Sequence, residues 1–224
     1  LTWGYLVSTF STGVLVVLLV ILFAWQTVHF NSEITALDTM IYLFEVGDPY
    51  TGAHSHRVAM IAEFLGEKLQ LRGKKLDKLV KSALLHDIGK VAIPRSILDK
   101  KGTLSVSEME VVKRHPVEGA KILSKFPHLS HLVPGVLLHH ERMDGSGYPY
   151  GLKDGEIPVE ARIIAVADVF EALISERPYR SALTPGEAIT LMKSLPLDQE
   201  IVEILERQLD TVLELLNRLV DQRL

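Results

Sequence analysis

Cysteine is absent from the 224-residue sequence. The chain therefore has no disulfide bond and no thiolate ligand for a metal ion. It also lacks an excess of positive charge, because 24 Lys and Arg residues stand against 28 Asp and Glu residues, a formal net charge of −4. Without a basic field over the whole molecule, we expect no nucleic acid polymer as a partner. A small anionic substrate would need local cationic side chains or metal ions.

The N-terminal stretch lacks charge altogether, since no Asp, Glu, Lys or Arg precedes Glu33. Residues 5–25 are almost wholly apolar, and about 20 apolar residues span the hydrocarbon core of a bilayer. Trp3 and Trp25 stand near the ends of this stretch, where aromatic belts lie. A signal peptide would have a basic start and a shorter apolar run. Residues 1–30 are therefore predicted to hold one transmembrane helix, with a buried core helix as the alternative.

The rest of the chain divides into three predicted parts. Residues 31–47 have the apolar spacing of a linker helix, which the DPYTG segment, residues 48–52, is predicted to break. Residues 48–204 form the main domain, and residues 205–224 form a C-terminal helical extension. Apolar residues recur at helical spacing throughout, and no pair of strands is evident. The predicted fold class is all-α.

Local signals mark the helix starts and one long loop. Ser105 and Thr184 are each followed three residues later by Glu, which is the pattern of a capping box. Residues 143–158 are rich in glycine and proline and are predicted to form a loop. The last helix is predicted to run over residues 198–223.

Histidine and aspartate supply the chemical signal, through their order along the chain. Successive members are separated by 32, 28, 24 and 28 residues, about one helix and one connection each time. Helices with this spacing can each send a ligand to a common centre, as in metal-binding helical bundles. The residues concerned are His54, His86, Asp87, His115, His139, His140 and Asp168.

Imidazoles together with carboxylates suit iron, manganese or zinc. A carboxylate such as Asp87 can bridge two metal ions, which can hold a hydroxide between them and clamp a phosphoryl group for attack. Lys90 stands four residues after His86 and would share its face if that helix continued so far. Taken singly, each of these residues is more often an ordinary core or surface residue. The remaining histidines are assigned to linker, surface or packing positions, and they are His29, His56, His128 and His131.

The ordered motifs resemble those of a known family. LLHDIGKVAIPRSIL resembles the HD signature of HD-domain phosphohydrolases, and HHERMDGSGYPYGL, from His139 to Leu152, matches the extended signature of the HD-GYP group. TGAHSHRVA, KRHPVEGAKIL and ARIIAVADVFEALISERPYR match the other blocks of that family in the same order. The resemblance covers about residues 38–204.

This resemblance implies an HD-type helical bundle that hydrolyses cyclic di-GMP to pGpG or GMP through a metal-bridging hydroxide. All seven His and Asp residues of the ordered set would be metal ligands, with iron or manganese as the metal. Asp87 and Lys90 would be catalytic, and Lys90 would also contact a substrate phosphate. The other implied substrate contacts are Tyr148, Arg177 and Arg180, although packing or exposed positions are alternatives for these three.

The residue at position 50 sets the expected number of metal ions. Some members of the family use a Glu four residues before the first ligand histidine for a third metal ion, and Tyr50 stands there in this sequence. A neutral phenol is a poor ligand for a divalent cation, so two metal ions are expected.

Two alternatives to the implied phosphodiesterase activity stay open. One is a catalytically silent receptor for cyclic dinucleotides. Another is a phosphohydrolase that acts on a different cyclic nucleotide.

The C-terminal residues raise the question of assembly. Val202, Leu205, Leu209, Val212, Leu216 and Leu219 are spaced by three and four residues, as in a coiled coil. This stripe either packs on its own chain or pairs with a second copy, which would make a homodimer. Because cyclic di-GMP is a messenger of the bacterial cytoplasm, the domain is expected on the cytoplasmic side of the inner membrane, anchored by the single N-terminal helix.

Overall fold

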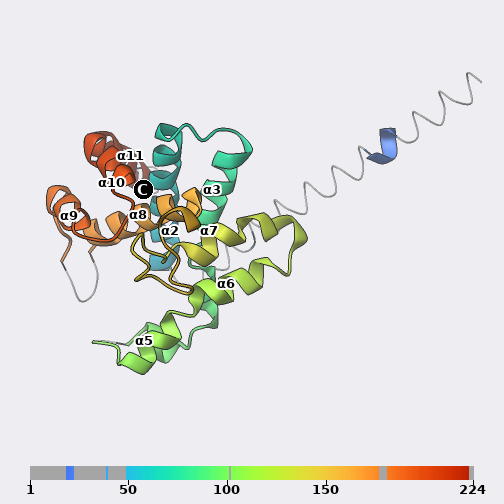
Figure 1. Ribbon diagram of the computed structural model, residues 1–224, viewed down its shortest axis with the longest axis horizontal. Coiled ribbons are helices and arrows are strands. Elements are labelled where there is room, and N and C mark those ends of the chain that lie inside the picture. The colour runs from blue at the N-terminus through green and yellow to red at the C-terminus, as the bar shows by residue number, and fades with distance from the viewer. Residues whose placement is uncertain (1–18, 23–38, 40–48, 101, 177–180, 222–224) are drawn as a thin grey trace, which may run out of the picture. The chain divides into compact units, whose positions relative to one another are not determined.

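The computed structural model describes residues 19–22, 39, 49–100, 102–176 and 181–221 (Figure 1). The chain divides into two units, Leu1–Tyr42 and Leu43–Leu224. In the first unit, residues 19–22 are helical, and the rest of the predicted transmembrane span lies outside the described residues, as does nearly all of the predicted linker helix. Within the described part of the chain, no helix is both long enough and apolar enough to cross a bilayer.

The second unit confirms the all-α prediction over its described residues. They contain no β-strand, and an isolated bridge pairs Asp144 with Lys153. The elements are α2 (Pro49–Lys68), α3 (Lys74–Leu85), η1 (Ile88–Ala92), α4 (Arg95–Leu98), α5 (Val106–Val112), α6 (His115–Leu123), η2 (Pro127–Leu132), α7 (Val133–Leu138), η3 (Asp154–Glu156), α8 (Val159–Ile174), α9 (Pro185–Met192), α10 (Gln199–Arg207) and α11 (Leu209–Asp221), where η marks a 3₁₀ helix.

The hydrophobic core forms around α2 and α8. Helix α2 packs against α3, α8 and α11, and α8 also contacts α7 and α9 (Figure 1). The core side chains include Leu65 of α2, Leu79 of α3 and Phe170 of α8, all with no exposed surface. Burying a side chain of this size stabilises the fold by about 1.5–3 kcal/mol. Because α2 and α8 are covered by other helices, residues on their inward faces are held firmly.

The DPYTG segment contains the start of α2. Residues 49–52 are helical, because α2 begins at Pro49 and continues through Gly52, and the predicted break between the linker helix and this segment lies outside the described residues. Proline is favourable at the first helical position, since its fixed φ suits the helix and its missing N–H has no partner to lose. The helix therefore runs without interruption past His54.

The predicted capping boxes and loop are confirmed. In Ser105–Glu108 and in Thr184–Glu187, the first side chain accepts from the backbone N–H of the glutamate, whose carboxylate accepts from the first residue's N–H. These reciprocal bonds satisfy donors that a helix start leaves free. Residues 143–158 hold only the short η3 before α8 begins at Val159.

The predicted single C-terminal helix is wrong, because the helix ends at Arg207 and a second helix starts at Leu209. Gln208 between them has φ −114° and ψ 15°, outside the α-helical range. Val202, Leu205, Val212 and Leu216 are buried in the core of their own chain. The intramolecular alternative is thus confirmed for these four residues. Pairing of two copies through the stripe is not supported, since its buried members have no free surface to offer.

Candidate metal centre

Five helices bring the seven predicted ligands into one region. Each residue lies in a described part of the chain, and most are buried. His54 is on α2, His86 and Asp87 follow α3, His115 opens α6, His139 and His140 follow α7, and Asp168 is on α8.

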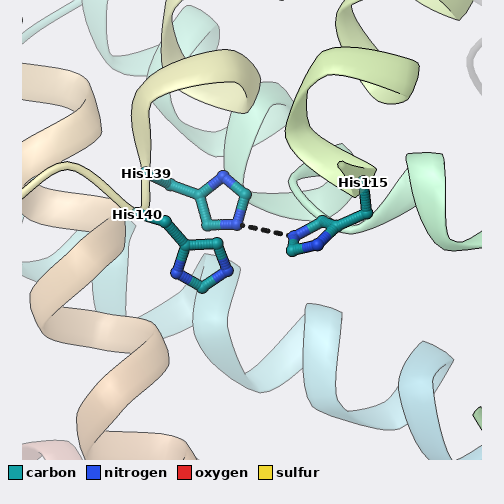
Figure 2. Close-up of side chains that lie close together, drawn as sticks. All are labelled: His115, His139 and His140. Carbon is teal, nitrogen blue, oxygen red and sulfur yellow. Dashed lines mark hydrogen bonds between the residues drawn. The ribbon is translucent and has the colours of Figure 1, made fainter. Parts of the chain in front are cut away.

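One cluster contains three imidazoles. Each of His115, His139 and His140 offers a ring nitrogen, and these nitrogens all lie within 4.8 Å of one another. Figure 2 shows the rings of His139 and His140 side by side, both facing the ring of His115. The Nε2 atoms of His115 and His139 are 3.3 Å apart (Figure 2). Converging ring nitrogens of this kind are what a cation site requires.

The second cluster contains His54, His86 and Asp87, whose potential ligand atoms also lie within 4.8 Å of one another. Asp168 borders this cluster. Its Oδ1 atom is 3.1 Å from Nε2 of His54 and 4.0 Å from Nε2 of His86. The carboxylate therefore adds an oxygen donor beside two nitrogen donors.

Asp87 joins the two clusters through its two carboxylate oxygens. Oδ1 lies 3.3 Å from Nε2 of His115, and Oδ2 lies 3.4 Å from Nε2 of His86. The side chain is only 3% exposed, so its charge acts in a largely dry environment. The predicted bridging role is compatible with this arrangement, because each oxygen faces a different cluster.

Backbone carbonyls orient three of the histidines. The Nδ1–H groups of His86, His115 and His139 donate to the carbonyls of Ala83, Val112 and Val136 at 2.7–2.8 Å. A carbonyl can only accept, so Nδ1 carries the proton and, in the neutral ring, Nε2 carries the lone pair. Each ring is thereby fixed with Nε2 directed at the centre, as metal-binding histidines usually are.

Protonation states in the three-histidine cluster suit cation binding. Burial lowers the pKa of His139 well below its usual value, and it lowers the pKa of His140 to about 3. Burial also lowers the pKa of His115. All three imidazoles are therefore neutral near pH 7, with lone pairs available to a metal ion.

The carboxylates of the centre are ionised. Burial alone would raise the pKa of Asp87, but interactions with Lys90 and His86 outweigh it and hold the pKa well below its usual value. The pKa of Asp168 is likewise held low, because His54 outweighs the effect of burial. Burial would lower the pKa of His54, yet Asp168 and Glu171 raise it to about 9. A cation bound by His54 would displace that proton.

The donor set fits divalent cations. Neutral imidazoles and ionised carboxylates suit iron, manganese or zinc. Nε2 of His86 is buried and has no hydrogen-bond partner among the described residues, although a buried polar atom normally has one. A metal ion would satisfy this nitrogen. The residues present are therefore compatible with the metal centre that the sequence predicts.

The position of Lys90 differs from the sequence prediction that it shares a helical face with His86. Helix α3 ends at Leu85, so His86 and Lys90 do not share a helical face. Lys90 lies in the 3₁₀ helix η1, and its Nζ donates to Oδ2 of Asp87 at 2.5 Å. The lysine still reaches the centre, because a 3₁₀ turn brings side chains three residues apart together.

The other predicted substrate contacts have separate outcomes. Arg177 and Arg180 lie outside the described residues. The ring of Tyr148 stacks on His140, with centroids 4.7 Å apart and an angle of 28°, and Nζ of Lys113 lies 5.8 Å from its centroid. The tyrosine thus borders the centre, but one of its faces already packs against a predicted ligand.

Sequence reasoning missed two buried acidic residues beside the centre. Glu141 accepts from the N–H groups of Tyr150 and Leu152 at 2.7 and 3.0 Å, which ties the glycine-rich loop to the His139–His140 segment. Glu171 contacts the ring of His54. A signal for Glu171 was available, because it follows Asp168 by three residues and so lies on the same face of α8.

Comparison with known proteins identifies the family and several relatives of this chain. The HD domain family matches residues 38–200. A cyclic di-GMP phosphodiesterase response regulator, RpfG of Xanthomonas campestris, is 43% identical over 72% of this chain and 43% of its own length. The 3'3'-cGAMP-specific phosphodiesterase 3 of Vibrio cholerae is 36% identical over 75% of this chain and 37% of its own length. The chain thus spans less than half the length of these two relatives.

A solved structure shares the fold. An HDGYP protein from Bdellovibrio bacteriovorus superposes with a TM-score of 0.59 at 24% sequence identity, covering 70% of this chain and 51% of the other. At this identity the likeness concerns the fold alone. It agrees with the helical architecture that gathers the seven side chains.

Proposed function

This chain belongs to the HD domain family and, within it, to the HD-GYP group, and from that premise we propose that it is a metal-dependent phosphodiesterase that hydrolyses cyclic di-GMP. The observation that carries the proposal is the position of Asp87, whose two oxygens face two separate groups of potential metal ligands. The relatives named as cyclic di-GMP phosphodiesterases support the choice of substrate.

The two clusters would hold one divalent cation each, with iron or manganese proposed. His54, His86 and Asp168 would bind one ion, His115, His139 and His140 the other, and Asp87 both. Bound ions would lower the pKa of water and neutralise phosphate charge. The chain's own contribution is to fix the ring nitrogens, keep the carboxylates ionised and keep bulk water away from Asp87.

Cationic and aromatic residues around the centre would bind the substrate. Lys90 already lies beside Asp87, and its ammonium would contact a substrate phosphate. Arg177 and Arg180 would each pair with phosphate oxygens, which a guanidinium can do through two parallel hydrogen bonds. Tyr148 would offer its free edge or hydroxyl, because His140 occupies one face of its ring.

Changing Arg177 or Arg180 to Ala should weaken substrate binding and leave the metal content intact. Loss of a charged hydrogen bond costs about 1.5–3 kcal/mol, which corresponds to roughly a 10- to 150-fold increase in KM. Steady-state kinetics with metal analysis of the same preparations measures both quantities. A fall in metal content in either variant would show that the arginine supports the centre instead of the substrate.

The test of the proposed function is metal quantitation on anaerobically purified protein, coupled to a turnover assay. We expect two metal ions per chain and conversion of cyclic di-GMP to pGpG or GMP. Three occupied sites would refute the argument from Tyr50. Binding of cyclic di-GMP without turnover in the metal-loaded protein would identify a silent receptor.

The same assay separates related substrates. Because the Vibrio cholerae relative is named as specific for 3'3'-cGAMP, that dinucleotide is the second candidate substrate. We expect a higher kcat/KM for cyclic di-GMP than for 3'3'-cGAMP. The reverse order would move this chain to the second substrate while leaving the metal mechanism in place.

Localisation is a separate proposal. The uncharged stretch over residues 5–25 supports a single membrane-spanning helix, with the domain that follows in the cytoplasm where cyclic di-GMP is found. A reporter fused after Leu224 should be active only if it works in the cytoplasm. Activity of a periplasm-dependent reporter would reverse the assignment.

A further inference from the structure

Three of the ligand histidines take their orientation from helix ends, where free carbonyls are available. His86 and His139 directly follow α3 and α7, and His115 lies just after α5. The last four carbonyls of a helix have no partner within it, and each of these rings donates Nδ1–H to such a carbonyl three residues earlier. The main chain of each ring's own segment therefore supplies the hydrogen bond that orients it.

His54 is placed differently, because it lies inside α2, five residues after the helix begins. Carbonyls inside a helix already accept from the N–H four residues later. The ring therefore needs a partner from another element, and that partner is Glu171 of α8, whose Oε2 contacts Nδ1 of His54. Nε2 of His54 is left to face Asp168 at 3.1 Å.

Glu171 is itself held rigidly. Its side chain has no exposed surface, and its second oxygen, Oε1, accepts from Nε of Arg57 at 2.5 Å and from Oγ of Ser175 at 2.7 Å. A buried carboxylate is costly unless it is paired in this way. With Oε1 engaged by two donors, Oε2 is directed at His54.

We propose that Glu171 is a positioning residue that fixes His54 and strengthens its Nε2 as a metal donor. This inference rests on the proposed function, because it assumes that His54 binds a cation. A carboxylate that accepts from the distal N–H of a histidine ligand fixes the ring and raises its basicity. The effect is confined to one half of the centre, since the three-histidine cluster is oriented by backbone carbonyls and by contacts among its own rings.

Glu171→Gln tests the proposal with little change of shape. Glutamine has an amide oxygen and an NH₂ group in place of the two carboxylate oxygens of Glu171. If the oxygen keeps Arg57 and Ser175, the NH₂ group faces Nδ1 of His54 and cannot accept its proton. Loss of such a partner lowers metal affinity by about 10- to 100-fold.

The experiment is equilibrium dialysis of metal-free full chain against Mn²⁺, with thermal unfolding of the metal-free protein as a check on folding. Wild type should bind two ions. In Glu171→Gln one of them should bind about 10- to 100-fold more weakly, while the other keeps its affinity. Glu160→Gln is the matched control, because Glu160 is a part-buried carboxylate of α8 that, like Glu171, pairs with a cation, in this case Lys78. It should leave both affinities unchanged.

The outcomes separate the two claims. If wild type binds no Mn²⁺, the proposed function fails. If wild type binds two ions and folded Glu171→Gln binds both as tightly, or loses both equally, the positioning role is wrong. Should Glu171→Gln fail to fold, Glu171→Asp keeps the charge for Arg57 but shortens the side chain by one methylene. It should weaken the same single site, and unchanged affinity there would equally overturn the proposal.

Discussion

Replacing Asp87 with Ala should abolish phosphodiesterase turnover. The residue is the one whose two oxygens face both clusters, at 3.4 Å from Nε2 of His86 and 3.3 Å from Nε2 of His115. Its loss removes the negative charge between them and leaves the ammonium of Lys90 without the carboxylate it contacts. Removing one preorganised group from an active site costs on the order of 10²- to 10³-fold in kcat. Here the loss should be at least that large, because the same residue would hold both ions.

Turnover under metal-saturating conditions and metal content should be measured together. Asp198→Asn is a suitable control, since Asp198 is another buried aspartate that pairs with a cation, Arg162, at 2.7 Å. It caps the start of α10, so this change should affect stability and leave turnover per folded molecule unchanged. An Asp87→Ala protein that keeps more than a few per cent of wild-type activity with normal metal content would contradict the bridging role.

The cluster of His and Asp side chains could be predicted from the sequence because its members are chemically distinctive. His and Asp at intervals of one helix and one connection have few structural explanations when they occur in this order. The structure places all seven together, from α2, α3, α6, α7 and α8. The spacing does not predict the direction of each imidazole ring, because that direction depends on where the histidine lies within its helix.

Glu171 illustrates this limit. A glutamate in an amphipathic helix is most often a solvated residue, and its position three residues after Asp168 places it on the same face of α8 without identifying its partner. Its role becomes visible only when His54 is known to lie inside α2, where carbonyls are already engaged, and when α8 is known to pack against α2. The position of His54 within α2 belongs to the secondary structure, and the packing of α8 against α2 belongs to the tertiary structure.

The C-terminal stripe shows the same limit for packing. Spacing by three and four residues shows that one side of a helix is apolar, but it does not identify the partner that covers it. Here α10 packs on α2, α8 and α9, and α11 packs on α2, so the chain itself covers Val202, Leu205, Val212 and Leu216 of the stripe. The break at Gln208 has no glycine or proline to signal it.

Gly89 packs so closely against α6, beside the candidate metal centre, that no Cβ atom fits at this position without a backbone shift. A Cβ atom at this position would lie 1.9 Å from the carbonyl oxygen of His115 and 2.5 Å from the backbone nitrogen of Gly119. Both contacts are with backbone atoms of α6, so rotation of a side chain cannot relieve them. Only movement of α6 away from η1 can make room, and His115 is the first residue of α6.

Gly89→Ala should therefore lower both stability and metal binding. Overpacking of a core costs about 1–3 kcal/mol and sometimes more. For a chain of this size each kcal/mol lowers Tm by roughly 2–4 °C. Nε2 of His115 lies 3.3 Å from Oδ1 of Asp87, and movement of α6 would increase this distance. The ion bound by the three-histidine cluster should therefore bind more weakly than the ion bound by the cluster that contains His54.

Gly186→Ala is the matched control. Gly186 lies in the first turn of α9, and an added Cβ would meet no atom within 4 Å. Alanine favours the helix by up to about 1 kcal/mol over glycine, so Tm should stay the same or rise slightly while both metal affinities are kept. Thermal unfolding and equilibrium dialysis against Mn²⁺ give the Tm and the two metal affinities of Gly89→Ala and Gly186→Ala for direct comparison. Equal Tm values and equal metal binding would mean that α6 and η1 can separate without cost, and that the position of His115 does not depend on the glycine at 89.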